Sequence, residues 1–221
     1  MDPIYIILVA FFPVLVGGFV IWGMVKGISA VNNRPVVLAG AGAPLGLALQ
    51  PDAVACAEAA LSRTIHPWAD AVAAVRGRVG DGDVTIVDLR YNVGGRSRYP
   101  RMMTVAVYHG PSGLPRMVLQ PRRHEQPAQL TEISCEEGDD ATLEFGMTYV
   151  VHGEDEAAVR ARVTAKVTAA LAILDGVDQA PCLDVLPDRI AYCRPRSVIE
   201  PDQLAGFVKE GRKLIALLRG A

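Results

Sequence analysis

The sequence predicts an α+β protein with one N-terminal transmembrane helix followed by a soluble domain, in which helices pack on one face of a mainly antiparallel sheet. Three observations support this fold class: a long uncharged run at the N-terminus, several β-rich segments separated by turn compositions, and two apolar stripes at helical spacing in the C-terminal half. The chain is expected to divide into an anchor (1–26), a Gly/Ala/Pro-rich lead-in segment (27–50) and a soluble α+β domain (51–221).

The anchor is predicted from residues 4–25, which carry no charged side chain. These 22 residues would rise about 33 Å as a helix, which is enough to cross the hydrocarbon core of a bilayer. A cleaved signal peptide is the alternative, but the chain opens with acidic Asp2 and offers only a poor cleavage sequence at residues 28–30. A retained anchor is therefore the preferred interpretation.

Charges beside the anchor indicate its orientation. Lys26 and Arg34 follow the run, whereas no Lys or Arg precedes it, so the soluble domain is expected in the cytoplasm. Gly23 and Gly27 stand at a G-x-x-x-G spacing, which would let a helix of a partner membrane protein approach closely.

The first part of the soluble domain is predicted to be helical and the next part to be a sheet. Asp52 can cap a helix over 53–61, and Pro67 can start a second helix that ends at Gly77. This second helix is favoured by the i, i+4, i+7 spacing of Trp68, Val72 and Val75. Three β-rich segments then predict an antiparallel meander, namely 84–91, 102–109 and 116–120.

The second part of the domain alternates strands with helices. Apolar side chains at every second position predict a strand over 143–152, and an apolar stripe predicts one helix over 154–176. Two short strands are expected at 182–186 and 189–193, followed by a C-terminal helix that starts at Pro201. The apolar stripe of that last helix consists of Leu204, Phe207, Val208, Leu214, Ile215 and Leu218.

Charge is unevenly distributed along the chain. Residues 76–125 hold nine Arg and four acidic residues, a net charge of +5, whereas residues 126–160 hold one Arg and nine acidic residues, a net charge of −8. One interpretation is that the cations contact anionic headgroups or a partner; the other is that the two segments neutralise one another. The candidate contact residues are Lys26, Arg34, Arg96, Arg98, Arg101, Arg122 and Arg123. Nucleic acid is not expected as a partner, because the basic turns hold few stacking aromatics and an acidic block follows them.

No local motif predicts a catalytic, cofactor or metal site, so no catalytic residue, cofactor or metal is expected. The histidines, at 66, 109, 124 and 152, show no H-x-x-x-H spacing, and the cysteines form no C-x-x-C. The four cysteines, at 56, 135, 182 and 193, are expected to be reduced and mostly buried; Cys182 with Cys193 is the first pair to test for a disulfide if the domain is extracytoplasmic.

The order of several segments resembles that of uncharacterised bacterial proteins with an N-terminal membrane anchor and unknown function. The segments are "VRGRVGDGDV", "LPRMVLQPRR", "FGMTYVVHGEDEAAVRARVTAKVTAAL" and "DRIAYCRPRSVIEPDQL". The resemblance implies only that the absence of a catalytic motif is unsurprising, and it assigns no functional residue.

Two functions follow as hypotheses. The first is a non-catalytic accessory or scaffold subunit of a bacterial membrane protein assembly, whose soluble domain binds a partner protein or the membrane surface. The second is a membrane-tethered domain that binds or converts a small anionic molecule, held by His109, His124 or His152 beside the arginines. Convergence of two of these histidines in one pocket would favour the second hypothesis.

Overall fold

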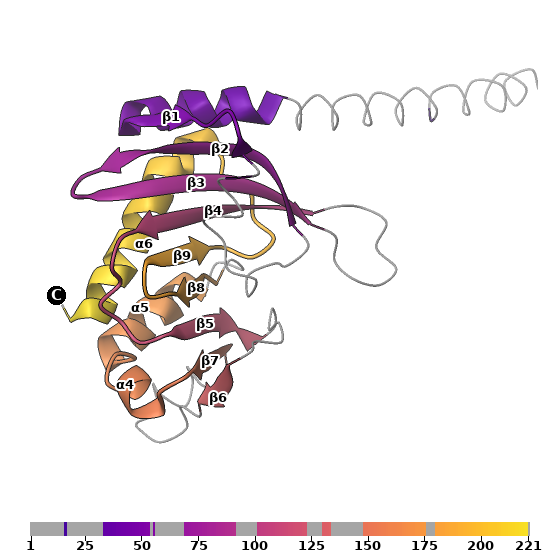
Figure 1. Ribbon diagram of the computed structural model, residues 1–221. Coiled ribbons are helices and arrows are strands. Elements are labelled where there is room, and N and C mark those ends of the chain that lie inside the picture. Colours follow the sequence, from indigo (N-terminus) through magenta and orange to yellow (C-terminus); the bar gives the residue numbers. More distant parts are fainter. Residues whose placement is uncertain are drawn as a thin grey trace, which may run out of the picture.

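The computed structural model shows an α+β fold built on one nine-stranded sheet (Figure 1). It describes residues 33–53, 69–91, 101–122, 130–133, 148–175 and 180–220, together with 16 and 55 and without the side chain of 175. The strand order is β1-β2-β3-β4-β9-β8-β5-β7-β6, and every pairing of neighbouring strands is antiparallel. The prediction of a mainly antiparallel sheet with helices is confirmed.

Long strands form one half of the sheet: β1 (Leu47–Leu49), β2 (Ala69–Val79), β3 (Gly82–Tyr91) and β4 (Arg101–His109). A two-residue turn joins β2 to β3, and its Gly80 has a φ of 61°, a left-handed value that glycine adopts without strain. The other half contains β5 (Met117–Pro121), β6 (Thr131–Ile133), β7 (Tyr149–Gly153), β8 (Cys182–Val185) and β9 (Arg189–Cys193). The strands expected near 84–91, 102–109, 116–120, 182–186 and 189–193 are therefore present.

The pairing of these strands differs from a simple meander. β4 pairs with β9, which follows it by about 80 residues, and β5 pairs with β7 and β8. A meander would require β4 to pair with β5, so that prediction was wrong at this step. The alternation of side chains shows that a segment is a strand, but the choice of neighbour depends on packing between distant segments.

The helices are residues 33–42, the 3₁₀ turns η1 (Ala43–Leu45) and η3 (Pro201–Gln203), α4 (Glu156–Arg160), α5 (Ala165–Asp175) and α6 (Leu204–Arg219). Residues 154–176 were expected to be one helix, yet α4 and α5 are separate. The carbonyl of Thr164 accepts the amides of Val167 and Thr168, so a new helix begins there. Threonine favours such helix starts over helix interiors, which explains the break.

Each face of the sheet carries its own apolar core. The larger core joins the sheet to the helix at 33–42, α5 and α6, with Leu38, Leu171 and Leu214 among its buried members. Helices α5 and α6 lie behind the sheet in Figure 1. The smaller core occupies the opposite face over β2, β3, β4, β8 and β9, and includes Val87, Val105 and Ala191.

Residues 69–79 form strand β2, so the helix predicted from Pro67 to Gly77 was wrong over these residues. The spacing of Val72 and Val75 fits a helix, but β2 pairs with β1 on one edge and β3 on the other. These tertiary pairings override the weak local preference of an alanine-rich segment. The helix expected at 53–61 is described only at Ala53 and Ala55, where the amide of Ala55 donates to the Asp52 carboxylate at 2.8 Å.

The predicted lead-in segment, 27–50, contributes a helix and strand β1 to the fold from residue 33 onward. Leu38 and Leu47 are buried in the larger core. The predicted transmembrane run at 4–25 lies outside the described residues except for Val16. In the part of the chain that the structure describes, no helix is both long and apolar enough to cross a membrane.

Candidate functional site

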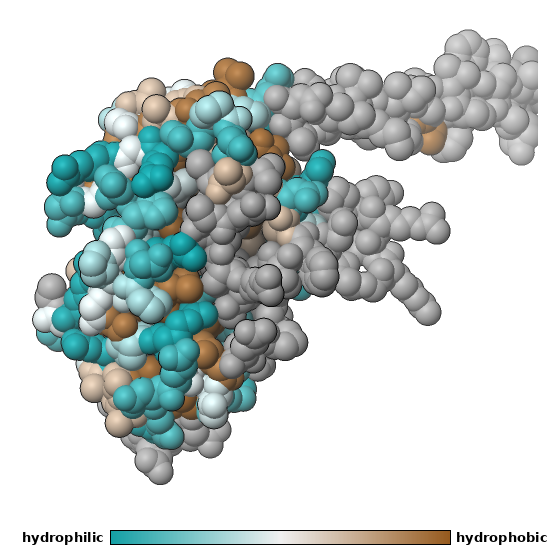
Figure 2. Space-filling view, viewed as in Figure 1, coloured by the Kyte–Doolittle hydropathy of each residue, from teal (hydrophilic) through white to brown (hydrophobic). Residues whose placement is uncertain are grey.

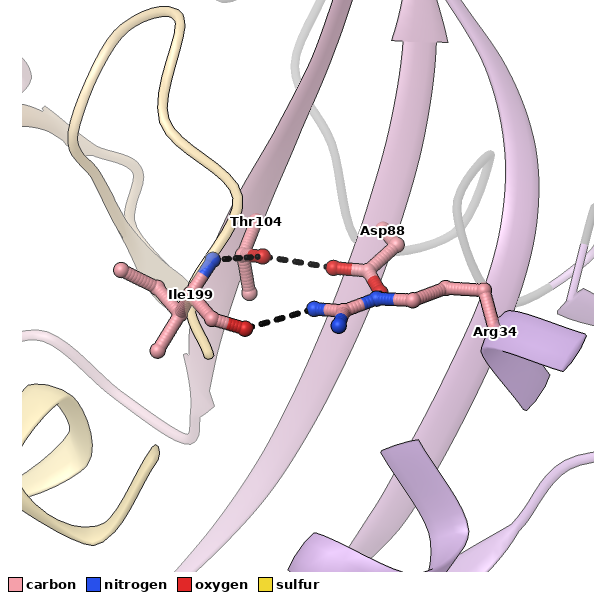
Figure 3. A network of polar contacts seen from close by, with 4 residues as sticks. All are labelled: Arg34, Asp88, Thr104 and Ile199. Carbon is pink, nitrogen blue, oxygen red and sulfur yellow. Dashed lines mark hydrogen bonds and ion pairs between the residues drawn. The ribbon is translucent and has the colours of Figure 1, made fainter. Parts of the chain in front are cut away.

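A buried polar network joins the helix at 33–42 to the sheet and to the segment before α6 (Figure 3). The structure describes this helix from residue 33 onward, and Arg34 lies in its first described turn. Arg34 follows Lys26 by eight residues. Its Nε donates to Asp88 Oδ2 at 2.5 Å, and its Nη2 donates to the carbonyl of Ile199 at 2.6 Å. One guanidinium therefore holds three separate segments together.

Thr104 completes this Arg34 network. Its hydroxyl donates to Asp88 Oδ1 at 2.6 Å and accepts the amide of Ile199 at 3.0 Å. The side chain of Asp88 is 0% exposed and that of Arg34 is 10% exposed. Both charges are thus removed from water and satisfied by the protein, which is the condition under which a buried ion pair is tolerated.

Arg34 was predicted to contact headgroups or a partner, and the structure instead places its guanidinium in the interior. Of the other predicted cations, Arg101 is exposed at the start of β4, and Arg122 is exposed with Glu132 at 3.3 Å. Lys26, Arg96, Arg98, Arg123, Gly23 and Gly27 lie outside the described residues. Of the three described cations, Arg34 is therefore buried, whereas Arg101 and Arg122 are exposed.

The two histidines that the structure describes from the second hypothesis do not converge. His109 is on β4 and His152 is on β7, four strand positions away, which is about 19 Å at the usual strand spacing. His124 lies outside the described residues. Within the described part of the chain, no group of three or more His, Cys, Asp or Glu side chains is placed to hold a metal ion.

Cys182 and Cys193 face one another as direct partners on β8 and β9, and both are free thiols. The sequence indicated this pair as the first to test for a disulfide in an extracytoplasmic domain, and the structure places the two residues together. A hydrogen bond with Cys193, together with burial, raises the pKa of the Cys182 thiol, so it stays protonated and unreactive at neutral pH.

An uncharged surface lies beside the Arg34 network, and sequence reasoning did not single it out. Residues 35–51 contain no charged side chain. Val36 is 72% exposed, Val37 38% and Leu49 45%, and β1 is the outermost strand at its end of the sheet. Figure 2 shows apolar residues along the upper rim of the molecule, over the helix at 33–42. The absence of charge over seventeen residues is the sequence signal that could have identified this surface.

The fold and this junction define a class of protein: a single-sheet α+β domain whose helix at 33–42 is fixed to the sheet by a buried ion pair. No family model matches the sequence, and no curated protein matches it. Among solved structures, the fold is similar to the crystal structure of the mycobacterial trehalose monomycolate transport factor A, TtfA. The TM-score is 0.54 at 12% sequence identity, and the match covers 86% of this chain and 95% of that chain. At this identity the similarity shows a shared fold.

Proposed function

We propose that this protein is a membrane-anchored, non-catalytic accessory factor of a bacterial transport assembly, and that its domain contacts a partner protein at the membrane. The Arg34 network is the observation that carries the proposal. Seven residues separate Val25, the end of the uncharged run, from Asn33, and they span at most about 25 Å. A domain fixed at Arg34 is thereby held close to the bilayer, as a membrane scaffold requires.

The similarity to TtfA supports the transport part of the proposal. That protein is named as a transport factor, and its match extends over most of both chains. The accessory role also agrees with the sequence, in which no catalytic motif is found. The role is extended to this chain from a shared fold, whereas the proposed partner-binding surface rests on this chain's own residues.

We assign the partner contact to the uncharged surface, defined by Val36, Val37 and Leu49. Apolar side chains that are exposed next to a membrane anchor favour an apolar partner surface, because both sides then lose water without burying a charge. No Lys, Arg, Asp or Glu lies within residues 35–51, so this segment itself brings no charge into the contact.

The test is purification of the full chain from native membranes in mild detergent, with the partner identified by mass spectrometry. Val36→Asp is expected to abolish co-purification, since it would place a charge in the contact. Ile173→Asp is the matched control, because Ile173 is 77% exposed on α5, away from this surface, and should retain the partner. A chain that runs as a lone monomer, or loses its partner equally in both variants, contradicts the proposal.

A further inference from the structure

A second cluster of polar side chains occupies one end of the sheet, on the face opposite to α5 and α6. Ala74, Val87, Val107 and Ala191 all belong to the smaller core on that face. Because strand side chains alternate between faces, the residues two positions further towards this end point to the same side. They are Arg76 on β2, Thr85 on β3, His109 on β4 and Arg189 on β9.

Strand register places these four residues next to one another. Arg76 is the direct partner of Thr85, and His109 is the direct partner of Arg189. A hydrogen bond of 2.8 Å between Thr85 Oγ1 and His109 Nε2 connects the two pairs. The cluster therefore runs continuously across four strands, and Figure 2 shows hydrophilic residues gathered at this end of the sheet, at the left of the view.

The charges of this strand-end cluster are mostly positive. Arg76 is exposed, and among the described residues its guanidinium has no ion pair or hydrogen bond. Arg189 has a side chain that is 22% exposed and lies 3.5 Å from the carboxylate of Asp188, which is itself 69% exposed. Asp83 is the other acidic group that faces the cluster. Arg78, the next residue on this face of β2, adds a further exposed cation.

His109 reports on this environment. Burial is the main cause that lowers the pKa of His109. The positive charges of Arg76 and Arg189 lower this pKa further, whereas the negative charges of Asp83 and Asp188 raise it. A neutral imidazole between two guanidinium groups can take up a proton when an anion arrives and offsets their repulsion.

We propose that Arg76, His109 and Arg189 form a binding site for the oxyanion of a phosphate group, with Thr85 positioning the imidazole. Guanidinium groups match the geometry of phosphate oxygens, and an imidazolium adds a further charge-assisted donor. Arg76 is exposed and both His109 and Arg189 are partly exposed, so either a lipid headgroup phosphate or a free phosphate could reach the site. It does not depend on the partner contact proposed above.

The test follows the pKa of His109 by NMR in the full chain in neutral detergent micelles, with the imidazole signal assigned from its loss in His109→Gln. Two probes are used separately: inorganic phosphate, and micelles doped with phosphatidic acid. Bound phosphate is expected to raise the pKa of His109. A response to inorganic phosphate identifies a free-anion site, and a response to doped micelles alone identifies a headgroup site.

Arg76→Gln and Arg189→Gln are each expected to lower the affinity for phosphate about tenfold, measured as the phosphate concentration needed to raise the pKa of His109. The loss of a charge-assisted hydrogen bond implies a change of this size. The control is Arg90→Gln, since Arg90 is an exposed arginine of β3 that pairs with Asp70 at 3.4 Å. It should respond as the unmodified chain does. No change of the His109 pKa with either probe, or an undiminished response in both arginine variants, overturns the site.

Discussion

At the scale of single residues, the Arg34–Asp88 pair is a buried ion pair in which neither partner can be removed alone without cost. A buried ion pair contributes little net free energy to folding, because desolvation of both charges opposes their attraction. Removal of one partner is different, since it leaves the other charge buried without compensation. The pair therefore acts chiefly to fix where the helix at 33–42 lies on the sheet.

Asp88→Ala is expected to lower the free energy of unfolding by about 3–5 kcal/mol, because Arg34 would keep a buried charge without its carboxylate. Denaturant unfolding followed by circular dichroism measures this loss. The double variant Arg34→Met with Asp88→Leu should recover part of it, since neither charge then remains. A double variant as unstable as the sum of the two single variants would show that the pair has no such coupling.

At the scale of elements, α6 approaches the sheet most closely at Gly211 among the α6 glycines that the structure describes. A Cβ at Gly211 would collide with the hydroxyl of Tyr108 and lie 2.9 Å from Cδ1 of Tyr192. Tyr108 has no freedom to retreat without losing the 2.8 Å hydrogen bond from its hydroxyl to the carbonyl of Val208. Burial raises the pKa of Tyr108, so its hydroxyl remains a donor at all physiological pH values.

Gly211→Ala is therefore expected to destabilise the domain by roughly 1–3 kcal/mol, even though alanine favours a helix over glycine. Gly206→Ala is the control in the same helix, since no atom lies within 4 Å of a Cβ there. It should be neutral or stabilise by up to about 1 kcal/mol. Thermal unfolding of both variants measures the difference, and a melting temperature that rises in both would contradict the close contact.

Elements whose pattern is local were predictable from the sequence. Strands β3, β4, β8 and β9 and helix α6 were all expected near their observed positions, because the alternation or helical spacing of their apolar residues reflects the face they bury. Strand β2 was predicted as a helix, and β1 was not predicted. Both depend on pairing with other strands, which the three residues of β1 and the alanines of β2 do not signal.

At the scale of the whole molecule, the membrane anchor predicted at residues 4–25 would decide where the domain works. The full chain is expected to sediment with membranes from lysed cells, to resist a high-salt wash and to dissolve in detergent. Replacement of Leu8 and Val16 by Asp should release it, because two charges in the run make insertion costly. Recovery of the unmodified chain in the supernatant without detergent would remove both the anchor and the accessory role.

The candidate sites were less predictable than the fold class. The sequence suggested that His109 lies beside arginines, but not that those arginines are Arg76 and Arg189, which come from other strands. It also placed Arg34 among cations free to contact a membrane, whereas Asp88, which neutralises it, is 54 residues away. Such partners are set by the register of distant strands, which no local pattern records.

The sequence by itself determined the α+β class, most strands, the last helix and the uncharged run that predicts the anchor, because each follows from the spacing of apolar side chains along a short segment. The tertiary structure alone decided that β9 and β8 join the two halves of the sheet and that β2 is a strand. It also decided that Arg34 is buried and that Arg76, Thr85, His109 and Arg189 meet. Each of these outcomes depends on contacts between residues far apart in the chain, which form only when the segments pack together.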